Sequence, residues 1–177
     1  MKTIYLLLIM AATISANGQD FCKQIKKEVS DNKVQTDYSS PFKQEHIPPV
    51  RVMRSVSTDA EFPFDNYTMI FQIHCGLGDI YDKTADGGQT EKKETKLVVT
   101  FADNSTITDD STEISHDFSD DRTEAMRNMY LPLTEGQVND FSTKRILKFS
   151  LAGQERLFPA DSSNALMQYV KCMKEAK

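Results

Sequence analysis

Three cysteines place the strongest constraint on how this chain of 177 residues can fold. Cys22 lies near the start of the chain, Cys172 near its end, and Cys75 between them. Their effect depends on the compartment, because disulfides persist in exported proteins and are rare in the cytosol. In an oxidising compartment the simplest outcome is one disulfide and one free thiol, and the sequence leaves three pairings open.

The N-terminus predicts export. Lys2 precedes an apolar stretch at residues 3–15, which is too short to span a bilayer, and Ala16 and Gly18 are the small residues of a cleavage site. We therefore expect a signal peptide at residues 1–18 and a single secreted or periplasmic domain at residues 19–177. A retained membrane anchor is the alternative, but the stop-transfer flank that it needs is missing. No later stretch of the sequence is long and apolar enough to form a transmembrane helix.

The charge of the chain excludes nucleic acid as an expected partner. The formal net charge is −5, and removal of the single lysine in the signal makes it about −6. Lysines and arginines are scattered among acidic residues, whereas phosphate binding needs them clustered. We expect the partner to be an envelope or extracellular macromolecule.

Most of the mature chain has the patterns of paired strands. Apolar residues alternate after the double proline before Val50 and most clearly along residues 67–75. Turn residues predict further hairpins around Asp103 and around Ala152. Residues 26–38 predict another hairpin, although a short helix with Ile25 and Val29 on one face is an alternative.

Two helices are predicted in the second half of the chain. Thr134 and Gln137 form a capping-box pattern, which predicts a short helix with Val138 and Phe141 facing inwards. The last residues have an amphipathic pattern, with apolar positions at helical spacing: Leu166, Tyr169, Val170 and Met173. The expected fold is a single α+β domain, in which an antiparallel β-sheet, mostly of hairpins, packs against the C-terminal amphipathic helix.

The predicted elements favour one cysteine pairing. Cys172 lies at the edge of the apolar stripe of the last helix, and Cys22 lies in a terminal segment that needs an attachment to be ordered. A Cys22–Cys172 bond would close almost the whole chain into a loop and stabilise it by about 4–5 kcal/mol. We favour this disulfide, with Cys75 as a buried free thiol. A bond to Cys75 stays open if its strand meets the edge of the helix.

The adjacent His74 and Cys75 do not predict a catalytic pair. Neighbouring side chains on a strand point to opposite faces, and a reactive cysteine needs its histidine beside it in space. Cys75 shares its face with the apolar side chains of the predicted core: Tyr67, Met69, Phe71 and Ile73. The sequence motifs of hydrolases and of nucleotide-binding enzymes are also absent. We expect no catalytic residue, no enzymatic activity and no cofactor.

An acidic run at residues 109–121 offers only weak metal ligands. The spacing of a calcium-binding loop is absent, and no second histidine or cysteine stands at zinc-ligand spacing. The favoured interpretation is a solvated loop without a metal. The weak candidate ligands are Asp109, Asp110, His116, Asp117 and Asp120.

The order of the segments also suggests a group of proteins. The resemblance rests on the early cysteine, the strands around residues 67–73 and 96–107, the segment 131–151 and the closing helix with its cysteine. Together these resemble small exported proteins of Gram-negative bacteria, mostly uncharacterised. These proteins carry a cysteine near each end of the mature chain. The resemblance implies a periplasmic or secreted domain with a terminal disulfide, and it carries over no catalytic residue. The third cysteine departs from the pattern of the group.

Three functions stay open at this point. The first is a non-enzymatic binding domain that uses long polar loops, such as residues 76–95, as a contact surface. The second is a thiol- or metal-dependent enzyme that uses Cys75 or the acidic run. The third is a carrier of a small apolar ligand in a cavity between sheet and helix, with these candidate lining residues: Tyr67, Met69, Phe71, Met129 and Tyr130.

Overall fold

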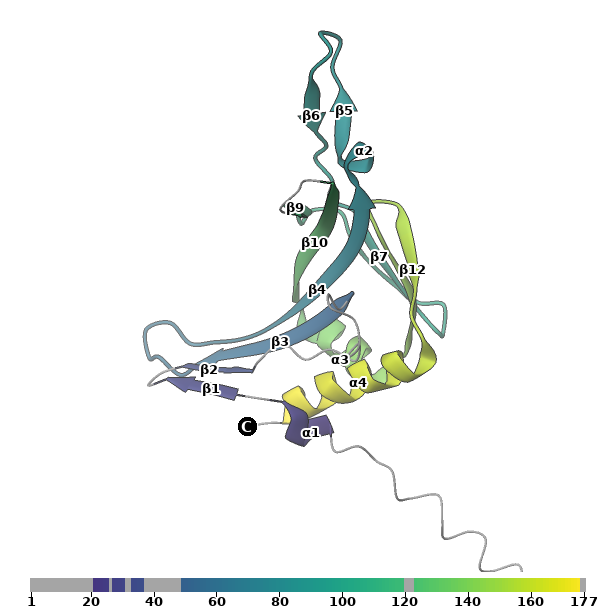
Figure 1. The fold of residues 1–177 in the computed structure, drawn as a ribbon. Coiled ribbons are helices and arrows are strands. Elements are labelled where there is room, and N and C mark those ends of the chain that lie inside the picture. Colours follow the sequence, from purple (N-terminus) through teal and green to yellow (C-terminus); the bar gives the residue numbers. More distant parts are fainter. Residues whose placement is uncertain (1–20, 26, 31–32, 37–48, 120–122, 176–177) are drawn as a thin grey trace, which may run out of the picture.

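Strand β4 (Phe64–Gly76) lies at the centre of the fold (Figure 1). The computed structural model describes residues 21–25, 27–30, 33–36, 49–119 and 123–175. Within these residues β4 pairs antiparallel with β3 (Val50–Ser57) along one edge and with β10 (Glu124–Leu133) along the other. Strands β3 and β10 thus take their register from β4.

Two further groups of strands complete the large sheet and form a second one. The large sheet has the order β1-β2-β3-β4-β10-β9 and the small sheet the order β12-β11-β7-β8. In the large sheet the outer strands are β1 (Lys27–Ser30), β2 (Lys33–Thr36) and β9 (Ser115–Phe118). The small sheet consists of β7 (Leu97–Phe101), β8 (Thr106–Asp109), β11 (Ile146–Leu151) and β12 (Gln154–Leu157).

Turn residues produce the two predicted hairpins of the small sheet. Asn104 has a φ of 65° in the turn between β7 and β8. Ala152 and Gly153 have φ values of 51° and 83° between β11 and β12. Ala152 and Gly153 form a two-residue hairpin turn, whose left-handed conformation matches the twist of the flanking strands. Asn104 lies in a longer turn between Phe101 and Ser105. The hairpin predictions are confirmed.

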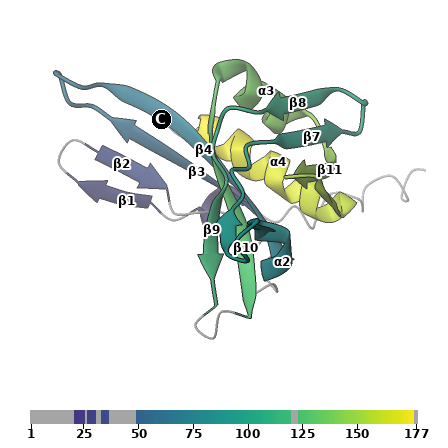
Figure 2. The ribbon, with the colours of Figure 1, turned by 90° about the horizontal axis from the view of Figure 1, so that it is seen from above.

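The core lies between the two sheets and two helices, α3 (Glu135–Thr143) and α4 (Ala160–Glu175). Seen from above, α4 lies between the β3–β4 part of the large sheet and the small sheet (Figure 2), and it contacts β3, β11 and α3. The ring centroids of Phe71 and Phe149 are 5.2 Å apart, which joins the two sheets. Phe101 and Phe141 are 5.4 Å apart and join the small sheet to α3. Each fully buried ring of this kind contributes about 1.5–3 kcal/mol.

Local sequence signals explain both helices. The Thr134 hydroxyl accepts from the Gln137 amide at 3.3 Å, and the Gln137 side-chain carbonyl accepts from the Thr134 amide at 2.8 Å. This capping box satisfies amide donors that the first turn of α3 leaves free. The predicted inward residues of α3 and α4 are buried: Val138, Phe141, Leu166, Tyr169, Val170 and Met173. The α+β fold expected from the sequence is confirmed.

The boundaries of two strands differ from the prediction. Strand β4 begins at Phe64, three residues before the predicted strand at residues 67–75, because residues 64–66 pair with residues 55–57 of β3. Ser115–Phe118 lies inside the acidic run, yet it forms β9 because its backbone pairs with β10. In both segments backbone pairing to a neighbouring strand outweighs the polar composition.

Near the N-terminus the predicted hairpin is confirmed, and the alternative of a helix that includes Val29 is wrong. Strands β1 and β2 pair antiparallel, with Val29 opposite Val34. Asp31 and Asn32, in the middle of the predicted hairpin, lie outside the described residues, as does the predicted signal at residues 1–18. Among the helices that the structure describes, none combines the length and the apolar character needed to cross a membrane.

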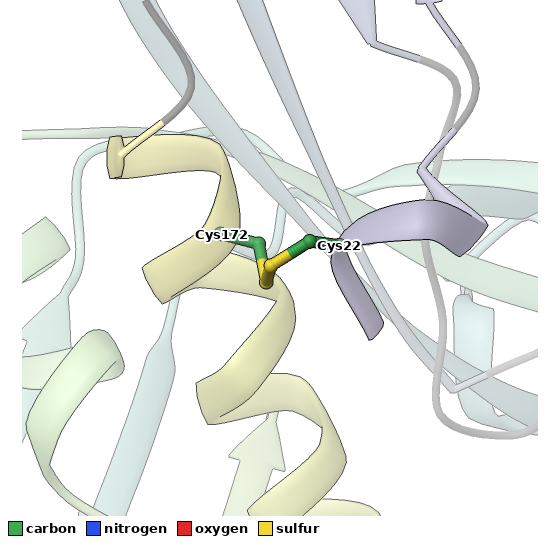
Figure 3. Close-up of a disulfide and its surroundings, with 2 residues drawn as sticks. All are labelled: Cys22 and Cys172. Atoms are coloured by element: carbon green, nitrogen blue, oxygen red, sulfur yellow. A yellow bond between two sulfur atoms is a disulfide. The ribbon is translucent and has the colours of Figure 1, made fainter. Parts of the chain in front are cut away.

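A disulfide joins the short helix α1 (Phe21–Gln24) to α4 (Figure 3). It connects Cys22 to Cys172, whose Cα atoms are 5.2 Å apart, across a sequence separation of 150 residues. Cys75 is a buried free thiol. The bond attaches the N-terminal segment to the last helix, and a disulfide is typical of an oxidising compartment.

The disulfide should contribute strongly to stability. Replacing Cys22 and Cys172 together by serine should lower the free energy of unfolding by about 2–5 kcal/mol, because the unfolded chain is no longer closed into a long loop. Urea unfolding followed by circular dichroism measures this change. As the control, a reducing agent should destabilise the native protein by a similar amount and leave the double variant unaffected. Equal stability of the oxidised protein and the double variant would contradict the prediction.

Candidate functional site

Residues 76–95 form an ordered arm that projects from the end of β4 (Figure 1). The arm contains helix α2 (Leu77–Ile80) and a hairpin of β5 (Tyr81–Lys83) and β6 (Gln89–Glu91). At its tip the Gly87 amide donates to the Thr84 carbonyl at 3.0 Å, with a φ of 83° at Gly87. The long polar loop expected from the sequence at residues 76–95 is therefore a folded hairpin.

The base of the arm packs on a small apolar cluster. Ile80 is fully buried against Cys75 and Ala125, with Leu77 and Tyr81 at the edge of this cluster. The Lys92 amide donates to the Ile80 carbonyl at 2.8 Å, which ties the two ends of the arm together. The Tyr81 ring also stacks on Phe118 of β9, with centroids 6.2 Å apart.

A buried arginine holds the arm from inside the fold. Arg127 of β10 is 3% exposed, and its Nε and Nη2 donate to the two carboxylate oxygens of Glu94 at 2.5 and 2.8 Å. Its Nη2 also donates to the Asp79 carbonyl at 2.9 Å. Such bidentate pairs are strong and directional. One guanidinium therefore contacts both the beginning and the end of the arm.

His116 of β9 extends this contact. Its side chain is 1% exposed, its Nδ1 lies 2.6 Å from a Glu91 oxygen, and its Nε2 lies 3.3 Å from a Glu94 oxygen. Each ring nitrogen thus faces a different carboxylate of the arm. We call Glu91, Glu94, His116 and Arg127 the anchor cluster. Its two carboxylates come from the arm, and its guanidinium and imidazole come from the sheet.

The opposite face of the same strands carries a second buried polar group. The Gln72 amide nitrogen donates to the Asn128 side-chain oxygen at 2.5 Å, and the Asn128 amide nitrogen donates to Asp117 at 2.8 Å. Gln72 and Asn128 are 3% and 0% exposed. These bonds cross β4, β10 and β9 and satisfy the Gln72 amide nitrogen and both polar atoms of the Asn128 amide, which would be costly to bury alone. The end of the sheet that supports the arm is therefore polar on both faces.

Cys75 and His74 lie beside the anchor cluster but do not form a reactive pair. His74 is exposed, whereas Cys75 is buried on the opposite face and directs its thiol to the Ala125 carbonyl at 3.5 Å. Burial raises the pKa of the Cys75 thiol, and the nearby Arg127 only partly offsets this effect. The thiol stays protonated at neutral pH, and a thiol is a poor nucleophile.

The weak metal candidates do not converge. Within the described part of the chain, no group of three or more His, Cys, Asp or Glu side chains is arranged to hold a metal ion. Asp109 closes its own turn by accepting from the Ser111 and Thr112 amides at 2.9 and 2.8 Å. Partial burial acts to raise its pKa, but these bonds keep the pKa below its usual value.

The other candidates point elsewhere. Asp110 is exposed, Asp117 accepts from Asn128, and Asp120 lies outside the described residues. His116 faces two carboxylates on opposite edges of its ring, so that no single point lies close to all three groups. A metal ion needs ligands that meet at one point.

A pocket of about 340 Å³ opens near the start of β4, between β3, α3 and the end of α4. Arg54 and Asp65 form one side of this Arg54 pocket. The Arg54 Nε and Nη2 donate to Asp65 at 2.8 and 2.7 Å, and its Nη1 donates to the Met173 carbonyl at 2.5 Å. The hydrogen bond to Arg54 lowers the pKa of Asp65. The other lining residues are Tyr67, Leu133, Glu135, Val138 and Lys174.

The five residues expected to line an apolar cavity do not do so together. Met69, Phe71 and Met129 are 0% exposed and fill the core. Tyr130 is exposed on the outer face, and Tyr67 lines the Arg54 pocket. The pocket beside them carries four charged side chains.

Comparison with known proteins gave no match: no family model, no curated protein and no solved structure matches the chain. The resemblance to exported Gram-negative proteins therefore has support only in the disulfide between the two ends of the chain.

Sequence reasoning missed the anchor cluster, although one signal for it was present. Arg127 alternates with Ala125, Met129 and Leu131, so the strand pattern places a charge on the core-facing side of β10. A charge at such a position needs a partner. The pattern could therefore have marked Arg127, but its partner Glu94 lies 33 residues away in a segment without a clear pattern.

The Cys75 thiol should react only when the protein unfolds. Because burial raises its pKa and blocks access, a disulfide exchange reagent at pH 8 should modify it at a rate that follows the unfolded fraction in urea. A Thr108→Cys variant places a thiol at an exposed position of β8 and should react at once in the native state. Rapid modification of Cys75 in native protein would contradict this prediction.

The Arg127–Glu94 pair should be costly to break on one side. Arg127→Met should lower the free energy of unfolding by about 3–5 kcal/mol, because Glu94 is then left without its cation. In a double-mutant cycle, Arg127→Met combined with Glu94→Leu should recover part of this loss. Lys148→Met is the matched control, since its partner Glu155 is exposed and the loss should be about 0–1 kcal/mol. Similar losses of stability in Arg127→Met and Lys148→Met would refute the prediction.

Proposed function

We propose that this chain is a non-enzymatic exported protein, a binding domain of the periplasm or cell surface that uses the arm to contact another macromolecule. The observation that carries the proposal is the projecting hairpin itself, held at its base by the ion pair of the buried Arg127 with the partly buried Glu94 (Figure 1). Binding segments are commonly loops held in place by a rigid scaffold. The anchor cluster gives the arm this rigid support.

The cost of the anchor cluster also supports a role for the arm. Burying charged groups is expensive, and an apolar cluster of the same size would often stabilise a fold as well or better. A cluster that satisfies Glu94 and the Asp79 carbonyl specifies where the arm begins and ends. The fold thus uses a directional interaction at the point where the direction of the arm is determined.

The surface of the arm suits a polar contact. Asp82, Lys83, Gln89 and Thr90 are exposed along the hairpin. At the tip the Asp86 carboxylate accepts from the Thr84 hydroxyl and, at 3.3 Å, from the Gly88 amide. A preorganised tip loses little conformational entropy when it binds.

A second exposed end supports the same role. The turn between β3 and β4 exposes Phe62 and Phe64, at 72% and 37% of their surface. The Asp59 carboxylate accepts from the Glu61 amide at 2.8 Å and orders this turn. Exposed aromatic residues at a hairpin end are typical of protein contacts.

The alternatives have less support. A thiol enzyme would need a reactive cysteine, and Cys75 is buried with a raised pKa. A carrier of an apolar ligand would need an apolar cavity, whereas the expected lining residues Met69, Phe71 and Met129 pack in the core.

Photocrosslinking in the native cells tests the proposal. A photoreactive phenylalanine analogue at position Lys83 should form one discrete adduct, and the same analogue at Thr108 on β8 should not. The crosslinking is then repeated with an excess of purified protein as a competitor. One competitor is the intact protein, and in the other an Asn-Gly turn replaces residues 82–90 and connects the paired residues Tyr81 and Glu91 directly. Intact protein should suppress the adduct and shortened protein should not. Absence of an adduct, or equal suppression by both proteins, would overturn the proposal.

A further inference from the structure

The Arg54 pocket contains polar groups that the protein itself does not use. Tyr67 is 8% exposed, and its hydroxyl has no hydrogen-bond partner among the described residues. The Glu135 carboxylate also has no ion pair or hydrogen bond with any residue that the structure describes. Within the described ranges, Lys174 donates only to the Asn139 side chain, at 3.3 Å, so further N–H groups are available.

The other side of the pocket is already satisfied. Arg54 donates to both Asp65 oxygens and to the Met173 carbonyl, and its guanidinium lies over the Tyr67 ring at 5.4 Å from the centroid. The charges of Arg54 and Asp65 therefore compensate each other. Arg54 therefore acts as a fixed wall of the pocket that orients Tyr67.

The unused groups define the chemistry of a ligand. Lys174, at the end of α4, suits a carboxylate, and Glu135, in the first turn of α3, suits an ammonium group. Leu133 and Val138 provide apolar surface, and the Tyr67 hydroxyl can donate or accept between them. The volume of about 340 Å³ is at the small end of the range for organic ligands.

We propose that the Arg54 pocket binds a small zwitterion with an aliphatic body, of the size of an aliphatic amino acid or a dipeptide. Its carboxylate contacts Lys174, its ammonium group contacts Glu135, and its aliphatic part lies on Leu133 and Val138. This site is independent of the arm, because Tyr67 lies near the start of β4 and the arm follows its end. Failure of the crosslinking experiment would therefore leave this inference intact.

Isothermal titration of the purified, disulfide-bonded protein with leucine and with leucyl-leucine tests the inference. At least one of them should bind. Its N-acetyl form and its C-terminal amide, which each lack one charge, should bind at least about threefold more weakly. Absence of binding of both probes at millimolar concentration, or equal binding of the blocked forms, would overturn the inference.

Variants assign the contacts. Lys174→Met should weaken binding of the zwitterion and have little effect on binding of the amide, which lacks the carboxylate. Glu135→Gln should weaken binding of the zwitterion and have little effect on binding of the acetylated form, which lacks the ammonium group. Tyr67→Phe keeps the ring and should raise the dissociation constant about two- to tenfold. Lys148→Met, on the small sheet, is the control and should bind as the native protein does. If Lys174→Met and Glu135→Gln bind the zwitterion as the control does, the proposed contacts are wrong.

Discussion

Strand β4 is paired along both edges, its middle is buried on both faces, and the positions of the other parts follow from it. Met69 and Phe71 fill the core on one face, and Ile70 and Gln72 are buried on the other. A strand in this position cannot shift its register without moving each of these side chains to the wrong face. Its start therefore holds Tyr67 in the Arg54 pocket, and its end carries the arm.

The two ends of β4 are built with different interactions. At the start, Asp65 of β4 holds Arg54 of β3, and Arg54 links the sheet to the last turn of α4 through the Met173 carbonyl, close to the disulfide at Cys172. At the end, Arg127 links the sheet to the arm through Glu94 and the Asp79 carbonyl. In both places an arginine fork satisfies a carboxylate and a backbone carbonyl at once, which suits its planar set of donors. Apolar packing holds the middle of the fold, and directional charge pairs hold the segments that project from it.

This arrangement bears on the proposed functions. The arm and the Arg54 pocket lie at opposite ends of the same rigid strand, so one domain can present a macromolecular contact and a small-ligand site together. Neither site uses Cys75. Its thiol completes the apolar cluster under Ile80 and Ala125, where a small side chain fits below the base of the arm. The free cysteine is thus explained by packing at the junction of arm and sheet.

The sequence by itself determined the elements whose signals are local. Strand alternation in residues 67–75, the capping box of Thr134 and Gln137, and the stripe that includes Leu166 and Met173 each predicted a correct element, because periodicity and capping act within a few residues. Only the tertiary structure decided which partners meet across the chain. The contact of Arg127 with Glu94, the folding of the polar arm, the pairing of β9 inside an acidic run and the convergence of Tyr67, Glu135 and Lys174 depend on long-range packing. A charge or a polar loop carries no periodic signal that names its distant partner.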